Sequence, residues 1–227
     1  MEFSTKELAR IIDHTLIKPT ATKGDVVKAC WEAEKYGFGC LVVNPYYVSL
    51  ARHNLEASEV KVCSTIGFTF GATLPEVKAE EARKVVELGA EELDMVMNIS
   101  AFKSREYDAV RKDIEEVVDV KRMNPKIIVK VIIETGFLTD GEKTGACKVV
   151  KEAGADFVKT STGFFGGGAT VNDVRLIRTA VGKEMGVKAA GGIRTLKDAL
   201  AMIEAGANRI GTSTAINIIE EIPRNEQ

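Results

Sequence analysis

The feature that most constrains the fold is a short string that recurs along the chain, in which a helical pattern ends at glycine and an apolar run follows. Three copies lie at residues 87–96, 152–159 and 204–211, and a looser one lies at 36–43. Glycine adopts the left-handed conformation that ends many helices, and an uninterrupted apolar run is typical of a parallel strand covered on both faces. The string therefore predicts a repeated helix–loop–strand unit.

The number of units indicates a closed barrel. Apolar runs predict strands, and periodic patterns predict the helices between them. Eight strands and eight helices give a single-domain (β/α)8 TIM barrel of the α/β class, whereas an open doubly wound sheet would need a GxGxxG turn after its first strand. The strand candidates are 11–15, which is the weakest, 41–43, 60–66, 93–97, 127–133, 157–158, 187–190 and Ile210, and the helix candidates are 23–36, 45–55, 75–88, 105–122, 140–153, 171–181, 196–205 and 215–221.

The length of the chain agrees with a single domain, and its charge argues against some classes of partner. The 227 residues fit one barrel over 1–227, with a short helix at 5–10 and a loose tail at 223–227. The 31 Lys and Arg against 33 Asp and Glu leave a net charge of -2, which argues against a nucleic-acid partner. No apolar run approaches the ~20 residues of a spanning helix, and the N-terminus lacks the apolar core of a signal peptide. We expect a cytoplasmic protein without a membrane partner.

Metal and disulfide sites are not expected. The four cysteines form no CxxC pair, and the chain has only two histidines, His14 and His53. Buried apolar placement is the ordinary state of such thiols. His14 is expected to be hydrogen-bonded at the first strand, and His53 to lie at the surface.

Four charged residues interrupt or end apolar runs, namely Asp94, Lys130, Lys159 and Lys188. Catalytic groups of a (β/α)8 barrel lie at the C-terminal ends of its strands, so these residues are candidates for the site. A buried carboxylate requires a cationic partner, which leaves Asp94 open as a structural ion pair or a catalytic group. Lys159 and Lys188 are each followed by small residues that leave room for a ligand.

A lysine at a strand end could be a phosphate-binding cation or a nucleophile. A second ammonium group nearby and removal from water both lower a lysine pKa, and the neutral amine can then attack a carbonyl. Two such lysines on neighbouring strands favour the nucleophile.

Glycine-rich segments at 163–168, 191–192 and 211–214 follow the last three predicted strands. That is the customary phosphate position of this barrel, although each segment alone is also compatible with an ordinary turn. Asp13 ends an apolar pair and is expected at the barrel mouth, where it could contact the substrate.

Five strings taken together resemble the deoxyribose-phosphate aldolase family over about residues 11–218. They are IDHTL at 12–16, ELDMV at 92–96, KVIIET at 130–135, VKTSTG at 158–163 and VKAAGGIRT at 187–195. The resemblance implies a class I aldolase that needs no metal or cofactor and cleaves 2-deoxy-D-ribose 5-phosphate to D-glyceraldehyde 3-phosphate and acetaldehyde. The implied partners are this phosphorylated sugar and these aldehydes, and we also expect a homo-oligomer.

The resemblance also implies individual roles. Lys159 would form the Schiff base, while Lys188 and Asp94 would tune that lysine and move protons, with Asp94 accepting the proton of the reacting substrate hydroxyl directly or through water. The phosphate would bind at Gly163, Gly191, Gly192, Gly211, Ser213 and Thr214.

Three departures limit the likeness. Val42 stands where many members carry cysteine, Phe164 stands where some carry lysine, and no tyrosine follows Tyr107, so the group that protonates the enamine is unassigned. Three alternatives stay open: another Schiff-base aldolase of the same barrel class, a phosphate-binding isomerase that uses Asp94 and forms no covalent adduct, and a sugar-phosphate sensor that binds without turnover.

Overall fold

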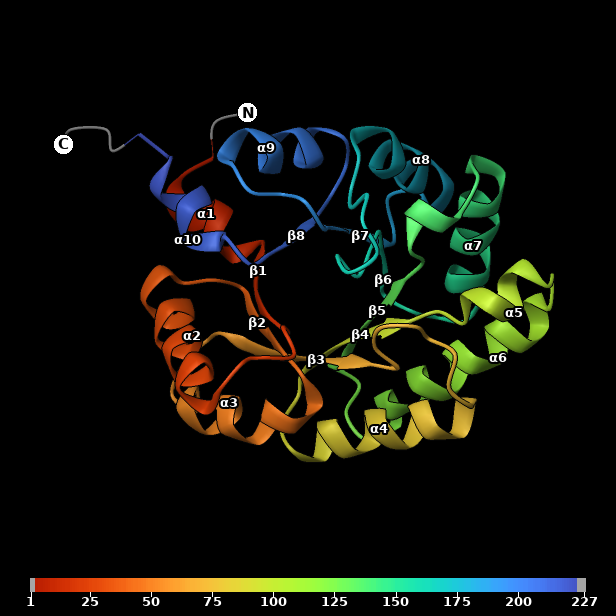
Figure 1. The fold of residues 1–227 in the computed structure, drawn as a ribbon, viewed down its shortest axis with the longest axis horizontal. Coiled ribbons are helices and arrows are strands. Elements are labelled where there is room, and N and C mark those ends of the chain that lie inside the picture. The colour runs from red at the N-terminus through yellow and green to blue at the C-terminus, as the bar shows by residue number, and fades with distance from the viewer. Residues whose placement is uncertain (1–2, 224–227) are drawn as a thin grey trace.

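The eight strands close into a parallel barrel, as predicted (Figure 1). The computed structural model describes residues 3–223, so residues 224–227 of the expected tail lie outside the described part. Each strand pairs with its neighbour in sequence, and pairing of the first with the last closes the barrel. The strands are β1 (Ile12–Leu16), β2 (Cys40–Val43), β3 (Lys61–Ile66), β4 (Glu92–Val96), β5 (Ile128–Ile132), β6 (Phe157–Lys159), β7 (Gly186–Ala190) and β8 (Arg209–Thr212).

The helices form a ring around the barrel (Figure 1). They are α1 (Thr5–Arg10), α2 (Lys23–Tyr36), α3 (Val48–Asn54), α4 (Pro75–Glu87), α5 (Ile99–Lys103), α6 (Tyr107–Val118), α7 (Asp140–Glu152), α8 (Val171–Val181), α9 (Leu196–Glu204) and α10 (Ala215–Glu220), with 3-10 turns η1 (Pro45–Tyr47), η2 (Asp119–Arg122) and η3 (Thr135–Phe137). Within residues 3–223, no helix is long and apolar enough to cross a membrane.

The helices after β4 differ in detail from the prediction. The helix expected at 105–122 ends at Val118 and continues as a 3-10 turn, and α5 precedes it although no helix was predicted there. The side chain of Asn98 starts α5 by accepting a hydrogen bond from the Ala101 amide at 3.0 Å. Five residues are too few to show a helical period, which explains why α5 was missed.

Backbone geometry explains the glycine in the recurring string. Gly89, Gly154 and Gly206 follow three helices with φ of 103°, 78° and 113°. Side chains other than glycine rarely adopt these angles, so glycine lets the chain turn from each helix into the next strand. A capping box starts α7, because the Thr139 hydroxyl accepts a hydrogen bond from the Glu142 amide and the Glu142 carboxylate accepts one from the Thr139 amide.

The apolar core lies outside the barrel wall. Its large cluster is built from helix residues and from strand residues such as Leu41, Leu93, Val131 and Val187. The barrel interior holds a much smaller apolar cluster of Cys40, Val42, Cys63 and Ile17. Most TIM-barrel interiors are filled with branched aliphatic side chains. Here charged side chains occupy that space, and they form the candidate site.

Candidate active site

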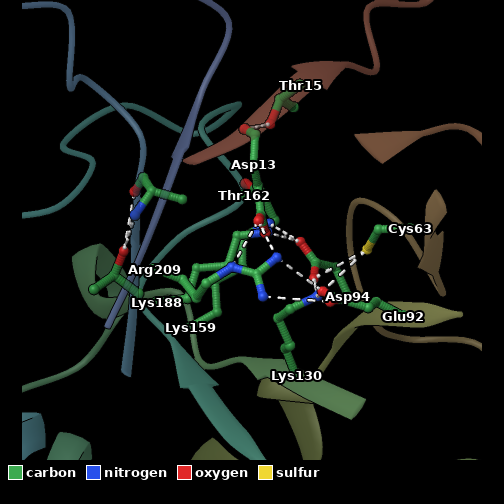
Figure 2. A network of polar contacts seen from close by, with 12 residues as sticks. Asp13, Thr15, Cys63, Glu92, Asp94, Lys130, Lys159, Thr162, Lys188 and Arg209 are labelled. Atoms are coloured by element: carbon green, nitrogen blue, oxygen red, sulfur yellow. Dashed lines mark hydrogen bonds and ion pairs between the residues drawn. The ribbon is translucent and has the colours of Figure 1, made fainter. Parts of the chain in front are cut away.

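Lys159, Asp94 and Lys188 meet inside the barrel, as the sequence predicted (Figure 2). Nζ of Lys159 donates a hydrogen bond to Oδ2 of Asp94 at 2.6 Å, and Nζ of Lys188 donates to the same oxygen at 2.6 Å. All three side chains are buried. Lys159 is the last residue of β6, but Lys188 is the third of five residues in β7, so its expected position at a strand end is wrong.

The surroundings push the two lysines in opposite directions. Burial lowers the pKa of Lys159, and the nearby Lys188 ammonium lowers it further, so that the pKa stays below its usual value despite Asp94. Burial also disfavours the charged form of Lys188, yet Asp13 and Asp94 together raise its pKa above the usual value. Lys159 therefore loses its proton more readily than Lys188 does.

Asp94 is held as a carboxylate. Burial alone would raise its pKa, but the ammonium groups of Lys130, Lys159 and Lys188 lower it to well below the usual range. A carboxylate in this state accepts hydrogen bonds and stabilises positive charge, and it binds a proton weakly.

Asp13 lies inside the barrel, and the expected position at the mouth is wrong. It is the second residue of β1, is fully buried and contacts Lys188 through Oδ2 at 2.5 Å. Its Oδ1 accepts a hydrogen bond from Nε of Arg209 at 2.8 Å. These two cations lower the pKa of Asp13 although burial opposes them.

Sequence reasoning missed two members of this network, Arg209 and Glu92, and gave a third no role. Arg209 begins β8 and contacts Glu92 at 3.1 Å, and Glu92 contacts Nζ of Lys130 at 2.6 Å. Lys130 also contacts Oδ1 of Asp94 at 3.0 Å. Lys130 had been noted as a charged residue in an apolar run but given no role. The available signal for Arg209 and Glu92 was their place in two copies of the recurring string.

One group of side chains resembles a metal-ligand set. Ligand atoms of Asp13, Cys40 and Glu92 lie within 4.8 Å of one another. Both carboxylates, however, already bind the guanidinium of Arg209. A divalent cation would have to share these carboxylates with a fixed positive charge, so the residues fit an ion-pair network better than a metal centre.

A cavity of about 330 Å³ lies at the C-terminal end of the barrel, and Lys159 is one of its lining residues. Asp94 and Lys188 are not among its lining residues. Of the predicted phosphate residues, Thr214 does not line it, because its hydroxyl instead lies 3.0 Å from that of Thr212. The lining comprises Thr15, Leu16, Ile17, Lys18, Lys159, Thr162, Gly163, Phe164, Ala190, Gly191, Gly192, Ile193, Arg194, Gly211, Thr212 and Ser213.

Glycines at and beside this cavity allow two loops to approach closely. A Cβ atom on Gly168 would lie 2.4 Å from the carbonyl oxygen of Gly191, and both residues have positive φ, 77° and 92°. The amide of Ala169 donates to the Gly191 carbonyl at 3.0 Å and ties the loops together. Lys18 and Arg194 add positive charge to the rim, which sequence reasoning did not identify. The rim thus combines bare backbone with two cations, a suitable environment for an anion.

The contacts of His14 are those of a residue with a structural role. Its Nε2 lies 3.2 Å from Oε2 of Glu32, and its ring lies 5.4 Å from that of Phe38. Burial lowers the pKa of His14, which favours the neutral ring. The expectation of a hydrogen-bonded histidine at the first strand is confirmed.

Comparisons with known proteins point to one family. The sequence profile of the DeoC/LacD family aldolases matches residues 8–221. A deoxyribose-phosphate aldolase of Thermococcus gammatolerans is 62% identical over 216 residues, covering 94% of this chain and 96% of that protein. One from Caldanaerobacter subterraneus is 56% identical over 220 residues, covering 97% and 95%. Among solved structures, the deoxyribose phosphate aldolase of Aeropyrum pernix, described as a tetramer, superposes with a TM-score of 0.90 at 39% identity and covers 96% of this chain and 91% of its own.

Proposed function

Because the chain belongs to the DeoC/LacD family of aldolases and is a lyase that reversibly cleaves 2-deoxy-D-ribose 5-phosphate to D-glyceraldehyde 3-phosphate and acetaldehyde, we propose that it does so through a Schiff base on Lys159. One observation carries the assignment. Among the lysines of residues 3–223, Lys159 is the one that is buried in the barrel and also lines the cavity. Lys18 lines the cavity but is exposed, and Lys130 and Lys188 lie beneath it.

The reaction begins with a neutral Lys159 amine. The amine attacks the sugar aldehyde, and loss of water leaves an iminium cation. The C2–C3 bond then breaks, its electrons move into the iminium to form an enamine, and the C3 hydroxyl loses its proton to become the aldehyde of glyceraldehyde 3-phosphate. Glyceraldehyde 3-phosphate departs, the enamine takes up a proton, and hydrolysis releases acetaldehyde.

Asp94 is better suited to stabilising the iminium than to storing the proton. Its Oδ2 lies 2.6 Å from the Lys159 nitrogen, where the positive charge of the iminium develops. Its low pKa and its absence from the cavity lining both make it a poor direct acceptor for the C3 hydroxyl proton. Of the two routes left open by the sequence, we propose transfer through water at the cavity, with Lys188 holding Asp94 in place.

We propose that the phosphate binds at Gly163, Gly191, Gly192, Gly211 and Ser213, with Lys18 and Arg194 supplying the positive charge that a lysine at the position of Phe164 would otherwise give. Thr214 would act indirectly, by fixing the hydroxyl of Thr212. Binding at this rim would orient the sugar so that its aldehyde meets Lys159.

The protein is further proposed to be a cytoplasmic homo-oligomer with one domain over 1–227. The tetrameric description of the Aeropyrum pernix relative supports an oligomer. So do the exposed apolar side chains of Phe70, Leu74 and Val77, which lie together before and at the start of α4. Light scattering on a size-exclusion column measures the mass, and a monomer at micromolar concentration would contradict this part.

The decisive test is reduction with borohydride in the presence of acetaldehyde, followed by peptide mass mapping. The expected result is a two-carbon adduct on Lys159 that is absent from Lys159→Ala. The matched control is Lys143→Ala, because Lys143 pairs with Asp173 at 2.6 Å outside the barrel. No adduct with either acetaldehyde or deoxyribose 5-phosphate would favour the isomerase, and an adduct formed only with another carbonyl compound would favour a different aldolase.

A further inference from the structure

The charged side chains inside the barrel form a closed ring in which positive and negative groups alternate (Figure 2). Asp13 bridges Arg209 and Lys188, with 2.8 Å to Nε of Arg209 and 2.5 Å to Nζ of Lys188. Lys188 leads to Asp94 at 2.6 Å, and Asp94 leads to Lys130 at 3.0 Å. Glu92 completes the ring, at 2.6 Å from Lys130 and 3.1 Å from Arg209.

Charge balance singles out Lys159. The ring has three cations and three carboxylates, so its formal charge is zero. Lys159 is attached to it from outside, through Asp94. A protonated Lys159 would therefore add one uncompensated charge to a buried site, whereas a neutral Lys159 adds none.

The remaining polar groups around the ring do not change this count. Cys63 contacts Asp94 at 3.4 Å and Lys130 at 3.6 Å, and burial raises the pKa of the Cys40 thiol well above its usual value. Glu134, after β5, accepts a hydrogen bond from the Thr162 amide at 2.9 Å. Every barrel strand thus contributes a titratable group to the interior: Asp13, Cys40, Cys63, Glu92 and Asp94, Lys130, Lys159, Lys188 and Arg209, from β1 to β8.

Arg209 occupies the part of the ring farthest along the barrel from the cavity. Arg209 and Glu92 are the first residues of β8 and β4, at the N-terminal end, where residues of this fold ordinarily serve stability. Arg209 contacts both Asp13 and Glu92 with one guanidinium, a group that does not lose its proton in proteins. It is thus the fixed charge that completes the balance.

We propose that Arg209 is a positioning residue for catalysis: by pairing with Asp13 and Glu92 it balances the three carboxylates of the ring, so that the ring has no net negative charge that would hold a proton on Lys159. This inference rests on the proposed function, since it assumes that Lys159 is the nucleophile. It assigns a catalytic consequence to a residue that does not touch the substrate.

The directions of the pKa shifts agree with the proposal. Asp94 and Glu92 raise the pKa of Lys130 well above its usual value despite burial, and the pKa of Lys188 is also raised. The pKa of Lys159 alone among these three lysines is lowered. A change in ring charge should therefore move the titration of Lys159 first.

Two substitutions that change the net charge of the ring in opposite directions test the proposal. Arg209→Met removes a positive charge from the ring and should move the acidic limb of activity to higher pH. Glu92→Gln removes a negative charge and should move it to lower pH. Arg209 and Lys159 stand two strands apart, about 10 Å, for which an effective dielectric constant of ~20 gives a shift of about one pH unit. The double variant Arg209→Met/Glu92→Gln and the conservative Arg209→Lys should both keep the wild-type limb.

The measurement is the rate at which acetaldehyde and cyanoborohydride trap Lys159, followed across the pH range with peptide mapping at each point. Trapping by acetaldehyde does not depend on the phosphate site. Arg52→Met is the matched control, because Arg52 pairs with Glu91 at 3.2 Å next to Glu92 but outside the barrel, and its limb should not move.

The outcomes separate the two proposals. If the wild-type protein is not trapped at Lys159, the proposed function fails. If the wild type is trapped but the Met and Gln variants move the limb in the same direction, or leave it within ~0.3 pH units, the positioning role of Arg209 is overturned. Should Arg209→Met not fold, Glu92→Gln and Arg209→Lys carry the test, and an unmoved or raised limb in Glu92→Gln refutes it.

Discussion

Replacing Lys188 by methionine should shift the activity of the protein to higher pH without destroying the nucleophile. Nζ of Lys188 and Nζ of Lys159 each lie 2.6 Å from Oδ2 of Asp94, so the two nitrogens are at most twice that distance apart. Two unit charges about 5 Å apart repel by about 3 kcal/mol at an effective dielectric constant of ~20, which corresponds to about 2 pKa units. Without this repulsion the pKa of Lys159 rises, and kcat/KM on the acidic limb falls about 100-fold.

The assay is the pH profile of kcat/KM for deoxyribose 5-phosphate, together with trapping by acetaldehyde. We expect Lys188→Met to approach the wild-type rate at about 2 pH units above the wild-type limb. Lys143→Met is the control, because it removes a lysine that is ion-paired outside the barrel, and its profile should be unchanged. A loss of the same size at every pH would refute the reasoning, since it would mean that Lys188 acts in a proton-transfer step and does not tune Lys159.

Three other predictions concern the loops and the stability of the fold. Gly168→Ala should raise KM for the phosphorylated sugar about tenfold, because φ is positive and the new Cβ would meet the facing loop, while unphosphorylated deoxyribose should be affected less. Lys78→Met should lower the free energy of unfolding by about 3 to 5 kcal/mol in urea denaturation, since it leaves the buried Asp113 unpaired, and adding Asp113→Leu should recover much of it. Hydrogen bonding from Lys103 lowers the pKa of Glu142 to about 2, so its stabilisation is present above the ordinary pKa of 4.5 and lost as pH falls toward 2; Glu142→Gln should weaken this part of the acid dependence of the melting temperature.

The fold could be predicted because the strands are covered on both faces. Such strands form continuous apolar runs. The strands expected at 93–97 and 187–190 agree with β4 and β7 to within one residue at every boundary. Helix α5 could not be predicted, because one short turn held by the side chain of Asn98 leaves no period in the sequence.

The charged part of the site could be predicted only where a charge interrupts an apolar run. Asp94, Lys159 and Lys188 do so, and the structure brings them together around one carboxylate oxygen. Arg209 and Glu92 begin their strands beside other polar residues and therefore resemble surface positions. The contact of Arg209 with Asp13 depends on the pairing of β8 with β1, a contact between the two ends of the chain that no local pattern records.

The arrangement of charges also explains why Asp94 does not simply hold Lys159 protonated. The same oxygen that stabilises the iminium formed on Lys159 also stabilises the ammonium that precedes it, and alone it would make the amine unreactive. Burial and the Lys188 ammonium oppose the ammonium form before the reaction. Once the iminium has formed, Asp94 stabilises its positive charge within a ring that is already neutral and fixed. The barrel interior therefore keeps the resting amine neutral and reactive, and it also places a carboxylate beside the charge that the reaction creates.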